Sequence, residues 1–97
     1  MLILPFRKQN AVIVFKGYYM GIEAGNVYVT STKQHRLVLK VENGQVTYVS
    51  KGDSGTDFNS LVEAQEERFE VAISGGTFYK AQESVLKANL EKFKVIP

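Results

Sequence analysis

Hydrophobic and polar residues alternate most clearly between residues 37 and 49, on both sides of an Asn-Gly pair. Residues 37–41 and 46–49 are rich in strand-forming residues, and Asn43-Gly44 lies between them. Asn and Gly both tolerate the positive φ that a type I′ turn needs at its two central positions. The pattern therefore predicts a β-hairpin with a two-residue turn.

A two-residue turn also fixes the register of this hairpin. Val41 then lies opposite Val46, Leu39 opposite Tyr48, and Val38 opposite Val49. One face carries the residues that we expect in the core, which are Leu37, Leu39, Val41, Val46 and Tyr48. The other face, which we expect in solvent, carries Arg36, Val38, Lys40, Glu42, Gln45, Thr47, Val49 and Lys51.

Four further strands are predicted before this hairpin or close to it. Residues 2–6 and 11–15 are apolar runs, and Pro5 places the first of them at an edge or an end. Residues 18–24 and 27–32 predict a second hairpin around Gly25-Asn26. The two hairpins are expected to lie in one sheet.

The segment after the Gly-rich loop at 52–57 predicts a short helix and then a strand. Ser60-Leu61-Val62-Glu63 has the spacing of a capping box, so we expect a helix of about two turns that ends near Arg68. Residues 69–74 alternate strictly, which predicts a strand with Phe69, Val71 and Ile73 inward.

The last part of the chain predicts an amphipathic helix with Thr77 as its N-cap. Its apolar arc consists of Phe78, Val85, Leu86, Leu90 and Phe93. Gln82 and Asn89 fall within the same arc, where polar groups need partners. Two interpretations stay open: the amides meet backbone at the sheet edge, or they set the register of a helix-mediated self-association.

These elements predict a single α+β domain over residues 1–97. We expect a curled antiparallel meander of six to seven short strands, forming a partly open barrel closed by the C-terminal amphipathic helix. This count of elements resembles the pleckstrin-homology superfold, which also has seven strands and a C-terminal helix. A resemblance at the level of the fold implies no function.

Composition narrows the class of protein. The chain has 44% hydrophobic residues and no Cys, which excludes disulfides and thiolate metal sites and suits a reducing compartment. No apolar run reaches membrane-spanning length. We therefore expect a cytoplasmic protein, in the host cytoplasm if its origin is a phage. Residues 1–51 carry seven Lys or Arg and two Glu, whereas residues 52–70 carry one Arg and six Asp or Glu.

Catalytic groups are not predicted. Gly52-Asp53-Ser54-Gly55 is similar to the segment around the nucleophile of trypsin-like serine proteases, but the chain is far shorter than those enzymes. His35 is the only possible base, and we interpret it as a solvated residue in a turn and the Gly-Asp-Ser-Gly segment as an ordinary loop. We expect no catalytic residue, no metal ligand and no cofactor.

The predicted solvent face of the sheet is the candidate binding surface. Its members are Tyr19, Tyr28, Arg36, Val38, Lys40, Val49 and Lys51. Tyr and Arg are enriched in protein interfaces, and aromatic residues among cations also suit single-stranded nucleic acids. The first hypothesis is a non-enzymatic protein-interaction module of the phage or mobile-element accessory type, an inhibitor or adaptor that acts through this face or an exposed strand edge. The alternative is a nucleic-acid-binding β-domain, and a weaker third is a small-ligand binder with its pocket between sheet and helix. Self-association through the C-terminal helix or a strand edge stays open.

Overall fold

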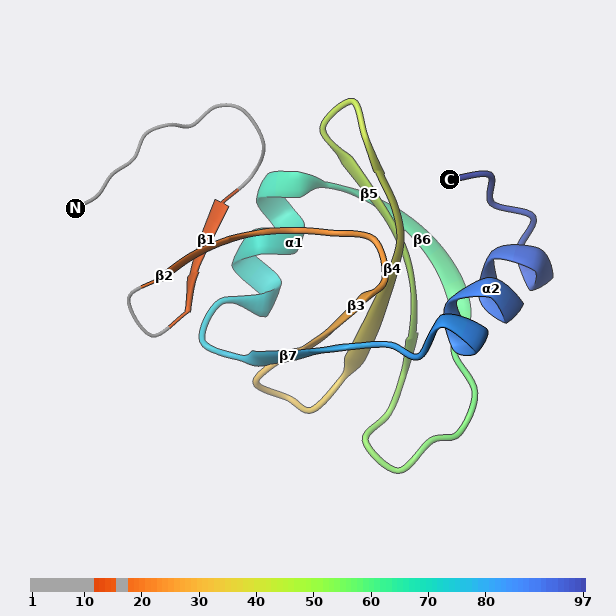
Figure 1. Cartoon of the computed structure of the whole chain (residues 1–97). Coiled ribbons are helices and arrows are strands. Elements are labelled where there is room, and N and C mark those ends of the chain that lie inside the picture. Colours follow the sequence, from red (N-terminus) through yellow and green to blue (C-terminus); the bar gives the residue numbers. More distant parts are fainter. Residues whose placement is uncertain (1–11, 16–17) are drawn as a thin grey trace.

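Two helices lie on opposite sides of a five-stranded antiparallel sheet in the computed structural model (Figure 1). The structure describes residues 12–15 and 18–97, with side chains from residue 21 onward. The sheet has the order β6-β5-β4-β3-β7. Its strands are β3 (Asn26–Val29), β4 (His35–Glu42), β5 (Gln45–Lys51), β6 (Asn59–Gln65) and β7 (Thr77–Lys80). Helix α1 (Glu66–Ile73) joins β6 to β7, and α2 (Glu83–Lys92) follows β7.

The predicted Asn-Gly turn is confirmed. Asn43 and Gly44 have φ values of 52° and 76°, the positive values of a type I′ turn. Beside the turn the register is also the predicted one, with Glu42 opposite Gln45 and Val41 opposite Val46.

Farther from the turn, the predicted register is wrong, because a β-bulge at Leu39 inserts one extra residue into β4. Beyond it, Val38 lies opposite Tyr48 and Leu37 opposite Val49. A bulge shifts every later residue of its strand by one position and so exchanges the two faces. Val38 therefore shares a face with Tyr48, not with Val49.

Both faces of the sheet are buried as a result. On the first face Tyr28, Val38, Val46 and Tyr48 pack with Phe69 and Ile73 of α1. On the second face Val27, Leu37, Leu39 and Val49 pack with Phe58 and with the apolar side of α2. The apolar residues of α2 on this side are Val85, Leu86 and Leu90, and Phe93 follows at the C-cap. This part of the predicted apolar arc is confirmed.

The predicted order of helix and strand in residues 60–74 is wrong. Residues 59–65 form strand β6, which pairs with β5, and Ser60 lies in this strand with φ 63° instead of capping a helix. The helix begins at Glu66, where Phe69 and Ile73 are four residues apart on its buried side. Val71, which alternation places in the core, is 75% exposed.

Residues 77–82 differ from the prediction in a similar way. Thr77–Lys80 is strand β7, paired with β3, and α2 begins only at Glu83. Gln82 is the exposed N-cap residue of α2 and lies outside the apolar arc. Asn89 is buried, but its Nδ2 donates to the Val85 carbonyl of its own helix at 2.9 Å instead of to the sheet edge.

The predicted hairpin around Gly25-Asn26 does not form. Strand β2 (Tyr18–Gly21) pairs with β1 (Val12–Phe15) in a separate two-stranded sheet, while β3 pairs with β4 and β7. The strand predicted at residues 2–6 lies outside the described residues. The α+β class and the small single domain are confirmed, but the sheet is open, with β6 and β7 at its edges. A six- to seven-stranded barrel and a pleckstrin-homology arrangement are not confirmed.

Gly76 allows β7 to approach β3. A Cβ at this position would lie 2.0 Å from the carbonyl oxygen of Val29, a backbone atom that cannot move without shifting β3. Any other residue would push the two strands apart where the chain enters β7 from α1.

We predict that Gly76→Ala destabilises the fold by about 2 kcal/mol or more, because the strand pair must separate to relieve the clash. Gly52→Ala is the matched control, since nothing lies within 4 Å of a Cβ at that position. Its effect should stay within about 0.5 kcal/mol. Urea unfolding of both variants measures the difference, and equal midpoints would contradict the close approach.

Candidate functional site

The predicted binding surface is divided between the two faces of the sheet. Arg36 lies on the α1 face, with its guanidinium 5.0 Å from the ring centre of Tyr48 and 5.8 Å from that of Phe69. The register places Lys40 and Lys51 on the α2 face. The bulge at Leu39 thus separates Arg36 from the two lysines, whereas the predicted register had placed all three on one face.

Three of the predicted surface residues are in the core. Tyr28 is 1% exposed, and Val38 and Val49 are both 0% exposed. The Tyr28 ring stacks on Phe78, and its hydroxyl donates to the Gly21 carbonyl at 3.3 Å. The expectation that these three side chains face solvent is wrong, because helices cover both faces. The side chain of Tyr19 lies outside the described residues.

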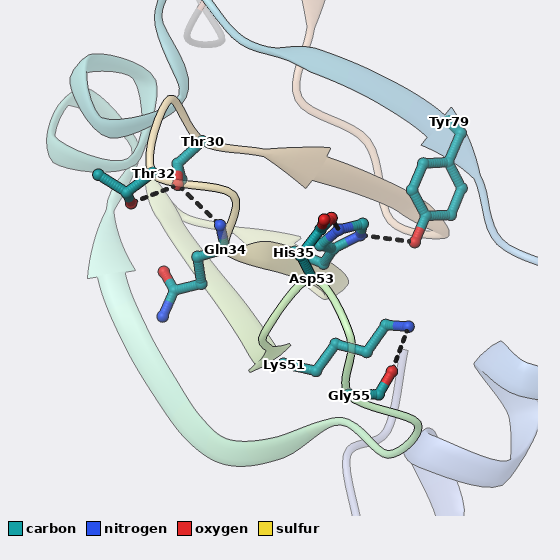
Figure 2. A network of polar contacts seen from close by, with 8 residues as sticks. All are labelled: Thr30, Thr32, Gln34, His35, Lys51, Asp53, Gly55 and Tyr79. Carbon is teal, nitrogen blue, oxygen red and sulfur yellow. Dashed lines mark hydrogen bonds and ion pairs between the residues drawn. The ribbon is translucent and has the colours of Figure 1, made fainter.

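His35 occupies a polar cluster instead of the solvated turn that the sequence predicted. It begins β4, and its side chain is only 14% exposed. Its Nε2 lies 2.8 Å from Asp53 Oδ1, and its Nδ1 lies 3.0 Å from the Tyr79 hydroxyl (Figure 2). We call Asp53, His35 and Tyr79 the clamp, because they join the loop after β5, strand β4 and strand β7.

The electrostatics of the clamp follow from its hydrogen bonds. The bond from His35 lowers the pKa of the Asp53 carboxyl by stabilising its charged form. Burial raises the pKa of the Tyr79 phenol, and the negative charge of Asp53 raises it further. In the neutral ring, Nε2–H donates to Asp53, and Nδ1 accepts the proton of a neutral phenol.

The clamp fixes the loop after β5 and does not activate a nucleophile. A tyrosine nucleophile is activated when its pKa is lowered, whereas the pKa of Tyr79 is raised. Both ring nitrogens of His35 have partners, so neither is available as a base for Ser54. The interpretation of Gly52-Asp53-Ser54-Gly55 as a loop stands, but Asp53 gives that loop a specific contact.

The outer edge of β6 is the second feature of interest. Among the described strands, β6 pairs only with β5. The Glu66 amide donates to the Gly44 carbonyl at 2.9 Å, which makes 44 and 66 a hydrogen-bonded pair of the antiparallel ladder. Because such pairs alternate, Glu63 directs its backbone N–H and C=O away from β5, and Gln65 directs its N–H the same way. The Gln65 carbonyl belongs to the N-cap of α1, where it accepts the first intrahelical hydrogen bond.

Two apolar side chains on this edge are exposed to solvent. Leu61 is 43% exposed and Val62 is 37% exposed. Lys40 lies near the same end of the sheet, but it forms an ion pair with Glu42 at 2.8 Å. Natural proteins usually protect such edges with charges, bulges or covering segments. Here one bulge, opposite residues 48–50, interrupts β6 between residues 59 and 62 and leaves residues 62–65 in regular register with β5.

Comparison of the chain with protein-family models, with curated proteins and with solved structures finds no match. In the part of the chain that the structure describes, no helix is long and apolar enough to cross a membrane. Within the same residues, no group of three or more His, Asp or Glu side chains is placed to hold a metal ion.

We predict that Asp53→Asn removes part of the acid sensitivity of the fold. A carboxyl with a depressed pKa stabilises the folded state above its ordinary pKa, and this contribution is lost as pH falls through the folded pKa. Asn keeps an oxygen that can accept from His35 but cannot titrate. Between about pH 5 and pH 3, the stability of the wild type should therefore fall more than that of the variant.

Urea unfolding at a series of pH values measures this difference. Asp57→Asn is the control, because it removes a carboxylate from the same loop without touching the clamp. If the two variants show the same pH profile, the Asp53–His35 bond contributes nothing to stability.

Proposed function

We propose that this chain is a non-enzymatic protein-interaction module that pairs an extended segment of a partner protein with the outer edge of β6. The observation that carries the proposal is the outward N–H and C=O of Glu63 and the outward N–H of Gln65, beside the exposed side chains of Leu61 and Val62. An added strand satisfies such groups with main-chain hydrogen bonds, and side-chain contacts supply specificity.

The charge around this edge defines the chemistry of the partner. Residues 52–70 carry six acidic residues and one Arg. Glu63 is exposed on β6, and Glu67 is exposed at the start of α1. Complementary charge favours an extended segment in which Lys or Arg alternates with apolar residues. Such a partner also satisfies the apolar side chains of the edge.

An inhibitor or adaptor of a larger assembly would use this mode of binding. Main-chain pairing recognises any sufficiently extended segment, so a small chain can occupy an edge-pairing motif that its partner normally offers to another protein. The nucleic-acid alternative rested on aromatic and basic side chains that share one face. It has less support, because Tyr28 is buried and the cations lie on different faces.

We predict that Glu63→Pro weakens binding to the partner strongly. Proline removes the outward N–H, and its ring occupies the space that an added strand needs, while the bonds to β5 come from neighbouring residues. Glu63→Gln is the matched control, because it removes the same charge and keeps the N–H. We expect affinity to fall about tenfold or more for the Pro variant relative to the Gln variant.

The experiment captures proteins from the native host on the wild type and both variants, and then measures amide hydrogen exchange with the purified partner. A protein retained by wild type and Gln but not by Pro, with slowed exchange at Glu63 and Gln65, supports the proposal. Equal retention by the Pro variant would show that the edge is not the site. Thermal unfolding establishes that the Pro variant is folded. Dimerisation of the wild type that only Pro abolishes would identify the occupant as a second copy and overturn the partner proposal.

A further inference from the structure

A hollow of about 330 Å³ lies beside the Asn43-Gly44 turn, between strands β4, β5 and β6. Among the described residues that line it, none comes from α2. The lining consists of Lys40, Glu42, Asn43, Gln45, Thr47 and Glu63. Because every one of these side chains is polar or charged, the hollow suits a polar group and not an apolar body.

The strand register places three of these side chains in one row across the sheet. Lys40 lies opposite Thr47, and Thr47 lies opposite Glu63. Directly opposed residues of antiparallel strands point to the same face, so the row runs from β4 to the outer edge at β6. A strand added at β6 would extend this row by one residue, the residue that lies opposite Glu63.

The charges of the lining leave Glu63 without a counter-charge. The Lys40 ammonium lies 2.8 Å from Glu42 Oε1, so these two charges offset each other. Among the described side chains, Glu63 forms no ion pair, and it is exposed at the edge. The hollow therefore keeps one net negative charge, which favours a cationic group.

Thr47, in the middle of the row, has a hydroxyl that is open to a ligand. The residue is only 7% exposed, and its side chain lines the hollow. No described residue forms a hydrogen bond with its Oγ1. Because buried polar groups normally have hydrogen-bond partners, a donor that enters the hollow satisfies this oxygen.

We infer that this hollow receives an Arg side chain from the partner residue that pairs with Glu63, an inference that rests on the proposed pairing at β6. Glu63 directs both its N–H and its C=O outward, so in an antiparallel pairing it exchanges two hydrogen bonds with one residue, whose side chain lies on the same face. Two N–H groups of the guanidinium bind the Glu63 carboxylate, and a further N–H donates to Thr47 Oγ1. Lys lacks this planar fork.

The two partner residues beside this Arg are apolar. They lie on the other face, next to Val62 and Ala64, which flank Glu63 on β6. The β5 neighbours of Val62 and Ala64 belong to the core that α1 covers. Apolar side chains at these two positions extend that core, so the centre of the partner segment has the sequence apolar-Arg-apolar.

The test titrates the full chain with a capped peptide of the sequence Thr-Val-Arg-Val-Thr and follows the NMR amide shifts of residues 62–65. Two further peptides carry citrulline or Lys in place of Arg, and citrulline keeps the shape of Arg without its charge. We expect the Arg peptide to bind with a Kd on the order of 1 mM. The citrulline peptide should bind about three- to fivefold more weakly, as suits an ion pair at an exposed edge, and the Lys peptide should lie between them.

Glu63→Gln and Glu67→Gln form a matched pair, because each removes one exposed carboxylate but only Glu63 lines the hollow. Glu63→Gln should reduce the preference for Arg over citrulline to less than about twofold, whereas Glu67→Gln should retain it. Glu63→Gln keeps the outward N–H, so the peptides should still bind. Thr47→Val removes the hydroxyl at nearly constant shape, and it should reduce the preference for Arg over Lys.

The results separate the Arg assignment from the edge pairing on which it rests. Equal binding of the Arg and citrulline peptides to the wild type would overturn the assignment and leave the pairing intact. Equal effects of the two Gln variants would do the same, because they would indicate attraction to the acidic segment as a whole. Glu63→Pro should weaken all three peptides, since it blocks the pairing itself. If no peptide shifts residues 62–65 at concentrations well above about 1 mM, the pairing fails, and the assignment fails with it.

Discussion

The extra residue at Leu39 in β4 is the constraint on which the rest of the structure depends. Leu37, Val38 and Leu39 are consecutive and all fully buried. Three buried neighbours in a strand require cover on both faces of the sheet. Because the bulge moves Val38 onto the face of Val46, each face obtains a continuous apolar surface, and each surface requires a helix.

This double burial decides where function can lie. A sheet with one free face could offer that face to a partner, as the sequence suggested. Here the faces are used by α1 and α2, so the available backbone lies at the edges, and the available side chains lie where a helix ends. The β6 edge is the clearest of these places.

Local signals in the sequence predicted the turn and part of α2, but not the pairing of distant segments. The Asn43-Gly44 turn is encoded by two residues, and it forms as predicted. Phe69, Val71 and Ile73 fit a strand by alternation, yet Phe69 and Ile73 fit a helix equally well. The deciding factor is that residues 59–65 pair with β5 as strand β6. Residues 66–73 then form α1 and cover the first face of the sheet. The choice between strand and helix is thus made by tertiary contacts, which a local sequence pattern does not encode.

The candidate sites show the same limit more clearly. His35 and Tyr79 are 44 residues apart, and no spacing indicates that they meet. The lone His and the Gly-Asp-Ser-Gly loop were each visible in the sequence, but their contact through Asp53 was not. Of the predicted surface residues, Lys51 holds the same loop, because its Nζ donates to the Gly55 carbonyl at 3.0 Å.

The loop between β5 and β6 links the two candidate sites physically. The clamp holds it at Asp53, Lys51 holds it at Gly55, and Lys92 Nζ donates to the Phe58 carbonyl at 3.2 Å. Lys92 also donates to Asn59 Oδ1 at 3.0 Å, at the first residue of β6. The edge strand is thus fixed at its start by α2 and at its end by the Glu66–Gly44 bond. A strand held at both ends loses little entropy when a partner segment pairs with it, so little of the binding energy is spent on ordering β6.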